Sequence, residues 1–328
     1  MKLKDLKYKH INIESKIDTL YVTFAAWNFY GNPEFFAEGF LFSRNIEAVL
    51  IAQNGINHWW HTDEILVVAD YVRKRAKETG KRVVLYGSSM GGYGVCHFRK
   101  LFDSYLAISI APQIFIDDIY HSEQHSTGGN KRALEEKLLL QDKFKFNELN
   151  NLNDQVDYPL HVYYDPMNRA DSSHVQCYKK NVIESGSVHF LSVPYTNHDV
   201  ARALNKAKFL EKIVLHSDLF SVAELRNMVK KTYLYDPKAC MNYLRKSEYP
   251  LDKKHLEFFE KYLLEHKTMD FEALYMTAEI LMKLNRYEEA INISLRSIEV
   301  YMSKYSKFAP EYLRNKFKFI VKKALSVK

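Results

Sequence analysis

Four of the chain's eleven glycines crowd into one short stretch, residues 87–94, which directly follows an apolar run. A strand that turns abruptly into a helix needs residues without bulk two positions before and after the residue at the turn. Gly87 and Gly91 flank Ser89 in this way, whereas the corresponding neighbours of Ser88 are bulky. The spacing therefore predicts that Ser89 is a serine nucleophile held at a strand-to-helix turn.

A serine hydroxyl is a weak nucleophile until a base accepts its proton and a third group orients that base. His198 lies in the loop after the last strand expected in the chain, and we predict it as the base. The preceding expected strand leads into two candidates for the acid. We prefer Asp165, which comes directly at the end of that strand, where ligand-facing residues gather in parallel sheets. Asp171, at the expected start of a helix, is the alternate.

The negative charge that develops on an attacked carbonyl oxygen needs backbone N–H donors. One donor is expected from Met90, the residue after the nucleophile, at the amino terminus of the following helix. The other is expected from the loop after the early strand, where we assign Trp27. The two N–H groups form the predicted oxyanion hole.

The elements that must position these residues alternate between short β-branched or aromatic runs and stretches of helical period, the pattern of parallel βαβ units. The expected strands are 20–26, 48–52, 82–86, 106–110, 160–164 and 188–193, and the expected helices between them are 63–77, 93–101 and 172–183. The strand runs do not alternate in polarity, so both faces of the sheet should be covered. We expect an α/β fold with a mostly parallel central sheet and helices on both faces.

Two domains are expected, 1–210 and 211–328. In the first, residues 117–157 interrupt the βα rhythm and are a candidate lid over the site. The second reads as helices throughout, at 221–232, 238–246, 253–266, 271–284, 287–301 and 310–326. The small residues Ala278 and Ala290 make 271–301 similar to one tetratricopeptide hairpin. The sequence shows no further repeats of this kind, so no array is predicted.

Composition excludes several classes of protein. Hydrophobic residues make up 47% of the chain and aromatic residues 14%, far more than a disordered chain carries. Three widely spaced cysteines form no disulfide framework and suit a reducing compartment. No secretory leader and no apolar run long enough for a bilayer are visible. We therefore expect a cytoplasmic protein without a transmembrane segment.

The formal net charge of +7 is unevenly distributed. Residues 211–328 contain 22 Lys and Arg against 16 Asp and Glu, but the two signs are interspersed, as on ordinary solvated helices. We expect no nucleic-acid partner, and the helical domain is the candidate surface for a protein partner. His58 and His61 have a metal-like spacing but no further ligands in a suitable pattern, so no metal site is expected.

The elbow Gly87-Ser-Ser-Met-Gly-Gly92, with acid and histidine following in that order, resembles the α/β-hydrolase superfamily over residues 19–205. Within it, the loop Tyr163-Tyr-Asp-Pro166 and the run Asn197-His-Asp199 look similar to capsule and accessory-secretion O-acetyltransferases, bacterial enzymes of surface-glycan pathways. The resemblance implies an acyl-Ser89 intermediate and no required cofactor. For a transferase it implies acetyl-CoA as donor and a sugar hydroxyl as acceptor.

Two classes of function follow. The first is an enzyme that passes the acyl group from Ser89 either to water or to a small-molecule or glycan hydroxyl, and both reactions use the same residues. The second is a non-catalytic scaffold that keeps the hydrolase fold and binds a protein partner through its helical domain. The presence of Ser89, Asp165 and His198 argues for the enzyme, because a scaffold needs none of them.

Overall fold

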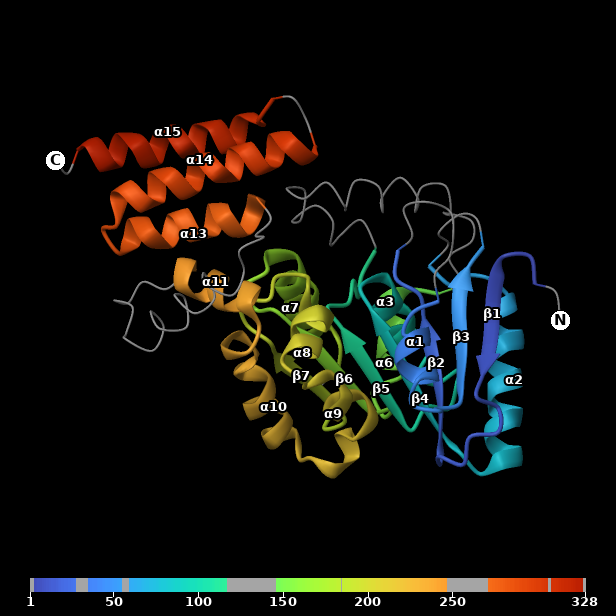
Figure 1. Cartoon of the computed structure of the whole chain (residues 1–328). Helices are drawn as coiled ribbons and strands as arrows, with labels where there is room; N and C mark the ends of the chain where they lie inside the picture. Colours follow the sequence, from blue (N-terminus) through green and yellow to red (C-terminus); the bar gives the residue numbers. More distant parts are fainter. Residues whose placement is uncertain are drawn as a thin grey trace. The chain divides into compact units, whose positions relative to one another are not determined.

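The computed structural model of the chain contains a seven-stranded sheet (Figure 1). The structure describes residues 3–27, 35–54, 59–116, 146–183, 185–246, 271–305 and 308–326. The strands are β1 (Leu6–Ile11), β2 (Thr19–Phe24), β3 (Ala48–Gln53), β4 (Arg82–Ser88), β5 (Leu106–Ile110), β6 (Leu160–Tyr164) and β7 (Val188–Ser192). Their order in the sheet is β1-β3-β2-β4-β5-β6-β7, with β1 antiparallel to β3 and the remaining pairs parallel. The mostly parallel sheet expected from the sequence is confirmed.

Strand β1 is the one that the sequence pattern did not predict. It forms an edge of the sheet, and Lys7 and Lys9 point to solvent between more buried neighbours. Exposed lysines are common on edge strands, where they discourage pairing with other chains.

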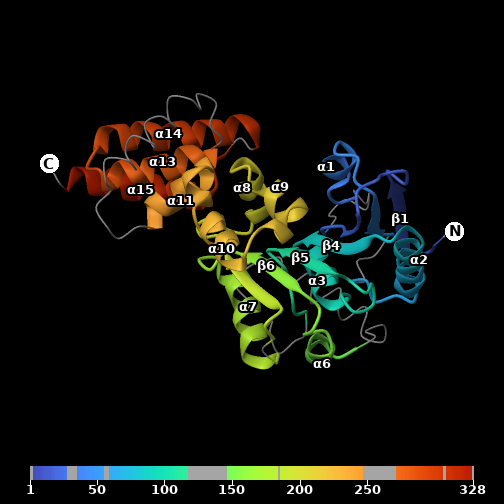
Figure 2. The same ribbon diagram turned by 90° about the horizontal axis from the view of Figure 1, so that it is seen from below.

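Helices cover both faces of the sheet (Figure 2), and each face has its own apolar core. The helices of one face are α2 (Glu64–Thr79), α3 (Met90–His97), α6 (Glu148–Asn153) and α7 (Arg169–Asn181). Those of the other face are α1 (Glu38–Phe42), α8 (Val200–Lys206), α9 (Leu210–Leu215) and α10 (Val222–Lys230). This arrangement is the expected α/β class, with parallel strands buried from both sides.

The chain divides into two compact units, Met1–Lys231 and Thr232–Lys328, so the division falls about twenty residues after the expected boundary at 210. The reason is the packing of α9 and α10. Val214, Leu225 and Val229 are buried in the core on one face of the sheet. In addition, the Tyr21 hydroxyl on β2 donates a hydrogen bond to the Val214 carbonyl oxygen (2.8 Å).

The second unit is helical in its described residues, as expected. It contains the short 3₁₀ turn η3 (Thr232–Leu234) and helices α11 (Pro237–Lys246), α13 (Phe271–Lys283), α14 (Tyr287–Lys304) and α15 (Glu311–Leu325). Helices α13 and α14 form a hairpin around Asn285, which has a left-handed backbone (φ 59°). Ala278 and Ala290 are buried between helices of this unit, where their small side chains allow close packing. The likeness to a tetratricopeptide hairpin stays a prediction.

Some expected features lie outside the described residues, namely the helix at 253–266 and most of the candidate lid, residues 117–145. The end of the lid segment is described and contains α6, which packs near α3. Among the described residues, no helix combines the length and the apolar character needed to cross a membrane.

Candidate active site

Ser89 stands at the apex of the turn from β4 into α3, with φ 55° and ψ −120°. A residue with a side chain rarely adopts this backbone conformation, which costs on the order of 1–3 kcal/mol and persists only where its surroundings enforce it. Two backbone hydrogen bonds with the segment at and after the end of β5 fix the apex. The Ser89 N–H donates to the Ile110 carbonyl oxygen at the end of β5 (3.0 Å), and the Gln113 N–H donates to the Ser89 carbonyl oxygen (3.2 Å).

The glycines around the apex are required by close backbone contacts. A Cβ atom at Gly87 would lie 2.4 Å from the Gly91 carbonyl oxygen, and one at Gly91 would lie 2.2 Å from the Phe24 carbonyl oxygen. Both distances are far inside van der Waals contact, and the opposing atoms are backbone, which cannot rotate away as the end of a flexible side chain can. Ser89, and not Ser88, therefore occupies the position between the two glycines at which the chain reverses.

His198 lies between Ser89 and an aspartate. Its Nε2 atom is 2.9 Å from Ser89 Oγ, and its Nδ1 atom is 2.7 Å from Asp171 Oδ1. A carboxylate can only accept hydrogen bonds, so Nδ1 carries the proton in neutral His198 and Nε2 is free to accept the Ser89 proton. The structure thus joins a hydroxyl, an imidazole and a carboxylate from three separate segments of the chain.

The carboxylate that contacts His198 is the alternate, Asp171, and not the preferred Asp165. Helix α7 begins at Arg169 after the N-cap residue Asn168, whose side chain accepts a hydrogen bond from the Asp171 N–H (3.1 Å). Asp171 is therefore in the first turn of α7 and not at its N-cap. Asp165 is fully buried at the end of β6, and its carboxylate accepts hydrogen bonds from backbone N–H groups.

The surroundings shift the pKa values of His198 and Asp171, the two titrating groups in this chain of hydrogen bonds. Burial by itself lowers the pKa of His198, but the hydrogen bond and negative charge of Asp171, together with the charge of Asp199, outweigh burial and raise that pKa above 6.5. Burial raises the pKa of Asp171, and the hydrogen bond with His198 opposes that rise only in part. A raised pKa makes His198 a stronger base than free imidazole, which suits proton removal from a serine.

The two predicted oxyanion donors, Met90 and Trp27, directly follow the apex and come three residues after the end of β2, respectively. Met90 is the first residue of α3, so its N–H has no acceptor within the helix. Trp27 follows β2, and the end of β2 packs directly against the elbow, as the contact between Gly91 and the Phe24 carbonyl oxygen requires. Their role in binding an oxyanion stays a prediction.

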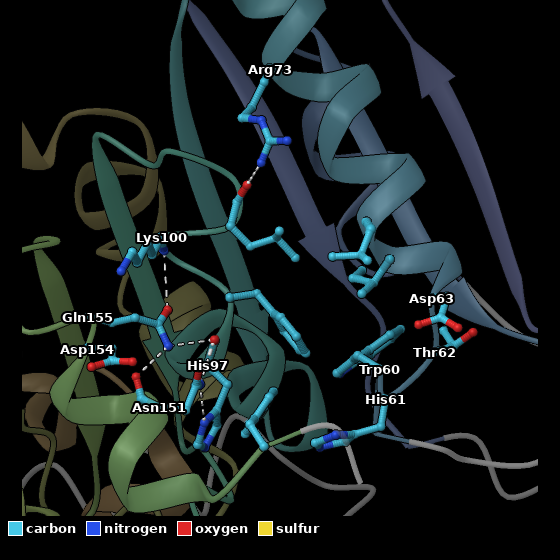
Figure 3. Close-up of a pocket in the computed structure, with 15 residues that line it drawn as sticks. Trp60, His61, Thr62, Asp63, Arg73, His97, Lys100, Asn151, Asp154 and Gln155 are labelled. Carbon is cyan, nitrogen blue, oxygen red and sulfur yellow. Dashed lines mark hydrogen bonds between the residues drawn. The ribbon is translucent and has the colours of Figure 1, made fainter. Parts of the chain in front are cut away.

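A cavity of about 490 Å³ lies beside the far end of α3, bordered by α2 and α6 (Figure 3). Its wall includes Trp60, Phe98 and Phe146, but none of the residues of the hydrogen-bonded chain described above. Burial lowers the pKa of His97 in this wall to about 3, so its ring is neutral. Both ring nitrogens of His97 are hydrogen-bonded within the protein. Nε2 contacts the Ile114 carbonyl oxygen (2.8 Å), and Nδ1 contacts the Asn151 side-chain amide (3.1 Å).

Two residues that shape the site were not recognised in the sequence as parts of it. Asn168 stands three residues before Asp171, which is the spacing at which an N-cap side chain accepts a hydrogen bond from the helix backbone. This spacing is visible in the sequence and could have identified Asn168. Gln113 follows β5, and its N–H holds the elbow carbonyl, which no sequence pattern indicates. Among the residues described here, no cluster of three or more His, Cys, Asp or Glu side chains could hold a metal ion.

The antiparallel edge strand, the elbow after β4 and the chain order serine, aspartate, histidine place the first unit in the α/β-hydrolase fold class. No family model and no curated protein sequence matches this chain.

Solved structures give weak likenesses. A glycosylation-associated protein complex from Streptococcus agalactiae is 16% identical over 63% of this chain, with a TM-score of 0.48, and the chain spans 43% of that protein's length. The capsule O-acetyltransferase of Neisseria meningitidis serogroup A is 12% identical over 65% of this chain and 92% of its own, with a TM-score of 0.48. An α/β hydrolase from a lagoon-sediment metagenome is 12% identical over 67% of this chain and 96% of its own, with a TM-score of 0.40. These likenesses say nothing of the reaction or the substrate.

Proposed function

We propose that this protein is a serine-dependent acyl-transfer enzyme that works through an acyl-Ser89 intermediate. The observation that carries the proposal is the continuous chain of hydrogen bonds from Ser89 Oγ through His198 to Asp171. Ser89 has a strained backbone and also contacts a histidine whose second nitrogen is held by a buried carboxylate. Together these features supply a nucleophile, a base and the group that orients the base.

In the first half of the reaction, His198 Nε2 accepts the Ser89 proton as Ser89 Oγ attacks the carbonyl carbon of the acyl donor. The backbone N–H groups of Met90 and Trp27 stabilise the resulting oxyanion. The oxyanion then collapses, the bond to the leaving group breaks, and His198 returns the proton to that group. The leaving group is an alcohol if the donor is an ester and a thiol if the donor is acetyl-CoA.

In the second half, His198 removes a proton from the acceptor hydroxyl, which attacks the acyl-Ser89 carbonyl and releases Ser89 with its proton restored. With water as acceptor the protein is an esterase. With a sugar hydroxyl it is an O-acetyltransferase, and the sequence resemblance to surface-glycan enzymes favours a carbohydrate acceptor. Both reactions require the same residues of this chain.

Labelling with a fluorophosphonate probe tests the serine chemistry, because such a probe reacts only with an activated serine. The wild-type protein should be labelled, Ser89→Ala should not be, and Ser88→Ala, which changes the neighbouring hydroxyl, should be labelled as the wild type is. An unlabelled wild-type protein would instead favour the non-catalytic scaffold. Intact mass after mixing with acetyl-CoA then separates the two reactions, since a gain of one acetyl group on Ser89 identifies the transferase.

A further inference from the structure

Asp165 is fully buried at the carboxyl end of β6, and its carboxylate accepts hydrogen bonds from three backbone N–H groups. Oδ1 accepts from Met167 (2.8 Å) and from Tyr195 (3.2 Å), and Oδ2 accepts from Asn197 (2.6 Å). Met167 belongs to the loop that leads to Asp171, while Tyr195 and Asn197 belong to the loop that carries His198. One carboxylate thus joins the two loops.

On the first loop, Asp165 starts a short series of turns that ends at Asp171, the carboxylate that contacts His198. Its side chain closes a turn onto Met167, and its carbonyl oxygen accepts from the Asn168 N–H (3.1 Å). Asn168 in turn accepts from the Asp171 N–H through its side chain (3.1 Å) and so begins α7. The position of Asp171 depends on this series because each turn fixes the start of the next.

On the second loop, Asp165 holds two residues in an unfavourable backbone conformation. Tyr195 (φ 69°) and Asn197 (φ 53°) both adopt the left-handed region that side chains disfavour. The N–H groups of these two residues are the ones that donate to Asp165, and Asn197 directly precedes His198. The carboxylate therefore stabilises a loop that would otherwise relax.

We infer that Asp165 is a positioning residue that holds His198 between Asp171 and Ser89 by joining the acid loop to the base loop. This inference rests on the proposed function and gives Asp165 no contact with the reacting atoms. Its chemistry requires a carboxylate, because three donors converge on it and an asparagine offers only one acceptor oxygen. In Asp165→Asn, the amide NH₂ would face at least one backbone N–H, so at least one of the three hydrogen bonds is lost: the bond from Asn197 if the amide oxygen takes the place of Oδ1, and the bonds from Met167 and Tyr195 if it takes the place of Oδ2.

The test is the variant Asp165→Asn, measured for its rate of fluorophosphonate labelling as a function of pH. A displacement of His198 of about an ångström should slow labelling on the order of 10²-fold. It should also weaken the contact with Asp171, so the His198 pKa should fall and the acidic limb of the pH–rate profile should move to lower pH. A loss of folded protein alone would reduce the amount labelled and leave that limb in place.

The matched control is Asp236→Asn. Asp236 is also fully buried and also accepts a backbone hydrogen bond, from the Ala239 N–H (2.7 Å), but it lies in the helical unit. This variant should lose stability and keep the wild-type pH profile. If Asp165→Asn behaves in the same way, or is labelled at the wild-type rate, Asp165 is a structural residue and the inference is wrong.

A second variant guards against failure of Asp165→Asn to fold. Glycine adopts the left-handed region freely, so Asn197→Gly should make the base loop less dependent on Asp165. Adding it to Asp165→Asn should restore part of the labelling rate relative to Asp165→Asn alone. Additive losses in the double variant would count against the inference.

An NMR titration of the His198 ring, assigned by comparison with His198→Gln, separates this inference from the proposed function. It needs no reaction, so it works even if the wild-type protein is never labelled. A His198 pKa that falls in Asp165→Asn and not in Asp236→Asn supports the inference; an unchanged value in both variants overturns it.

Discussion

His198 Nδ1 lies 2.7 Å from Asp171 Oδ1, and the two side chains differ sharply in exposure, 45% for His198 and 2% for Asp171. The imidazole can therefore be reached from solvent while the carboxylate behind it is shielded. A shielded carboxylate orients and stabilises an imidazolium more strongly than an exposed one, because water does not screen the pair. A substrate can meet Ser89 and His198 without meeting Asp171.

This geometry predicts that Asp171→Asn disables the site. An asparagine can donate to Nδ1 and so favour the wrong tautomer of His198, in which Nε2 carries the proton and cannot accept one from Ser89. We expect the rate of labelling, and of any ester hydrolysis, to fall on the order of 10³–10⁴-fold. Stopped-flow or gel-based labelling kinetics would measure the loss. A rate within tenfold of wild type would exclude Asp171 as the acid.

The pH dependence of the wild-type protein gives a second prediction. The reaction needs neutral His198, and Asp171 raises the pKa of His198 above 6.5. Activity should therefore be lost as the pH falls through that raised pKa, with the midpoint of the acidic limb above pH 6.5. In Asp171→Asn the hydrogen bond and charge of Asp171 are lost, and only the charge of Asp199 is left to oppose burial, which is the largest influence on His198 and lowers its pKa, so the limb should move to lower pH.

The measurement is the labelling rate constant between about pH 5 and pH 9 for both proteins, at constant ionic strength. Because the probe itself does not titrate in this range, the limb reports the base. A midpoint below pH 6.5 in the wild-type protein, or a limb that Asp171→Asn leaves in place, would contradict the assignment of His198.

The elbow could be predicted from the sequence because its cause is local. Gly87 and Gly91 are needed by backbone contacts within a few residues or with the neighbouring strand, and the pattern of small residues records this directly. The parallel strands were predictable for the same reason, since a run buried on both faces lacks polar positions.

The choice between Asp165 and Asp171 was not predictable with the same ease. The two carboxylates are six residues apart, on either side of the loop from β6 to α7, and which one reaches His198 depends on the path of that loop, which is held by hydrogen bonds to the distant segment around Tyr195. The start of α7 was easier to predict, because Asn168 has the spacing of an N-cap residue. The boundary between the two units, at residue 231, could not be predicted from the sequence. The apolar faces of α9 and α10 do not indicate whether these helices pack on a sheet or on other helices.

The contacts at the elbow predict that Gly91→Ala is strongly destabilising. Its Cβ would lie 2.2 Å from the Phe24 carbonyl oxygen, so β2 and α3 would have to separate. We expect a loss of about 1–3 kcal/mol in the free energy of unfolding, together with slower labelling, because the oxyanion donor at Met90 moves with the helix. Denaturant unfolding and labelling rate would be measured on the same preparation.

Gly39→Ala is the matched control, since nothing lies within 4 Å of a Cβ at that position in α1. It should leave labelling unchanged and stability equal or slightly higher, because alanine favours a helix over glycine. Equal effects of the two substitutions would mean that the close contact at Gly91 is absent in solution.

The division at residue 231 predicts how the chain tolerates truncation. A fragment ending at Lys231 keeps α9 and α10 and should unfold cooperatively and retain labelling at Ser89. A fragment ending at Leu210 loses Ile213, Val214, Leu225 and Val229, all of which are buried in the core on one face of the sheet. Burial of each such side chain contributes about 1.5–3 kcal/mol, and the sum is comparable with the whole stability of a typical domain, about 5–15 kcal/mol.

The shorter fragment should therefore fail to fold, which circular dichroism with thermal melting would show as the absence of a cooperative transition. The full-length chain, melted in parallel, gives the reference for the first unit. If the fragment ending at Leu210 melts cooperatively and is labelled as fast as the one ending at Lys231, α9 and α10 are not part of the hydrolase unit, because a unit cannot lose four buried side chains without loss of stability.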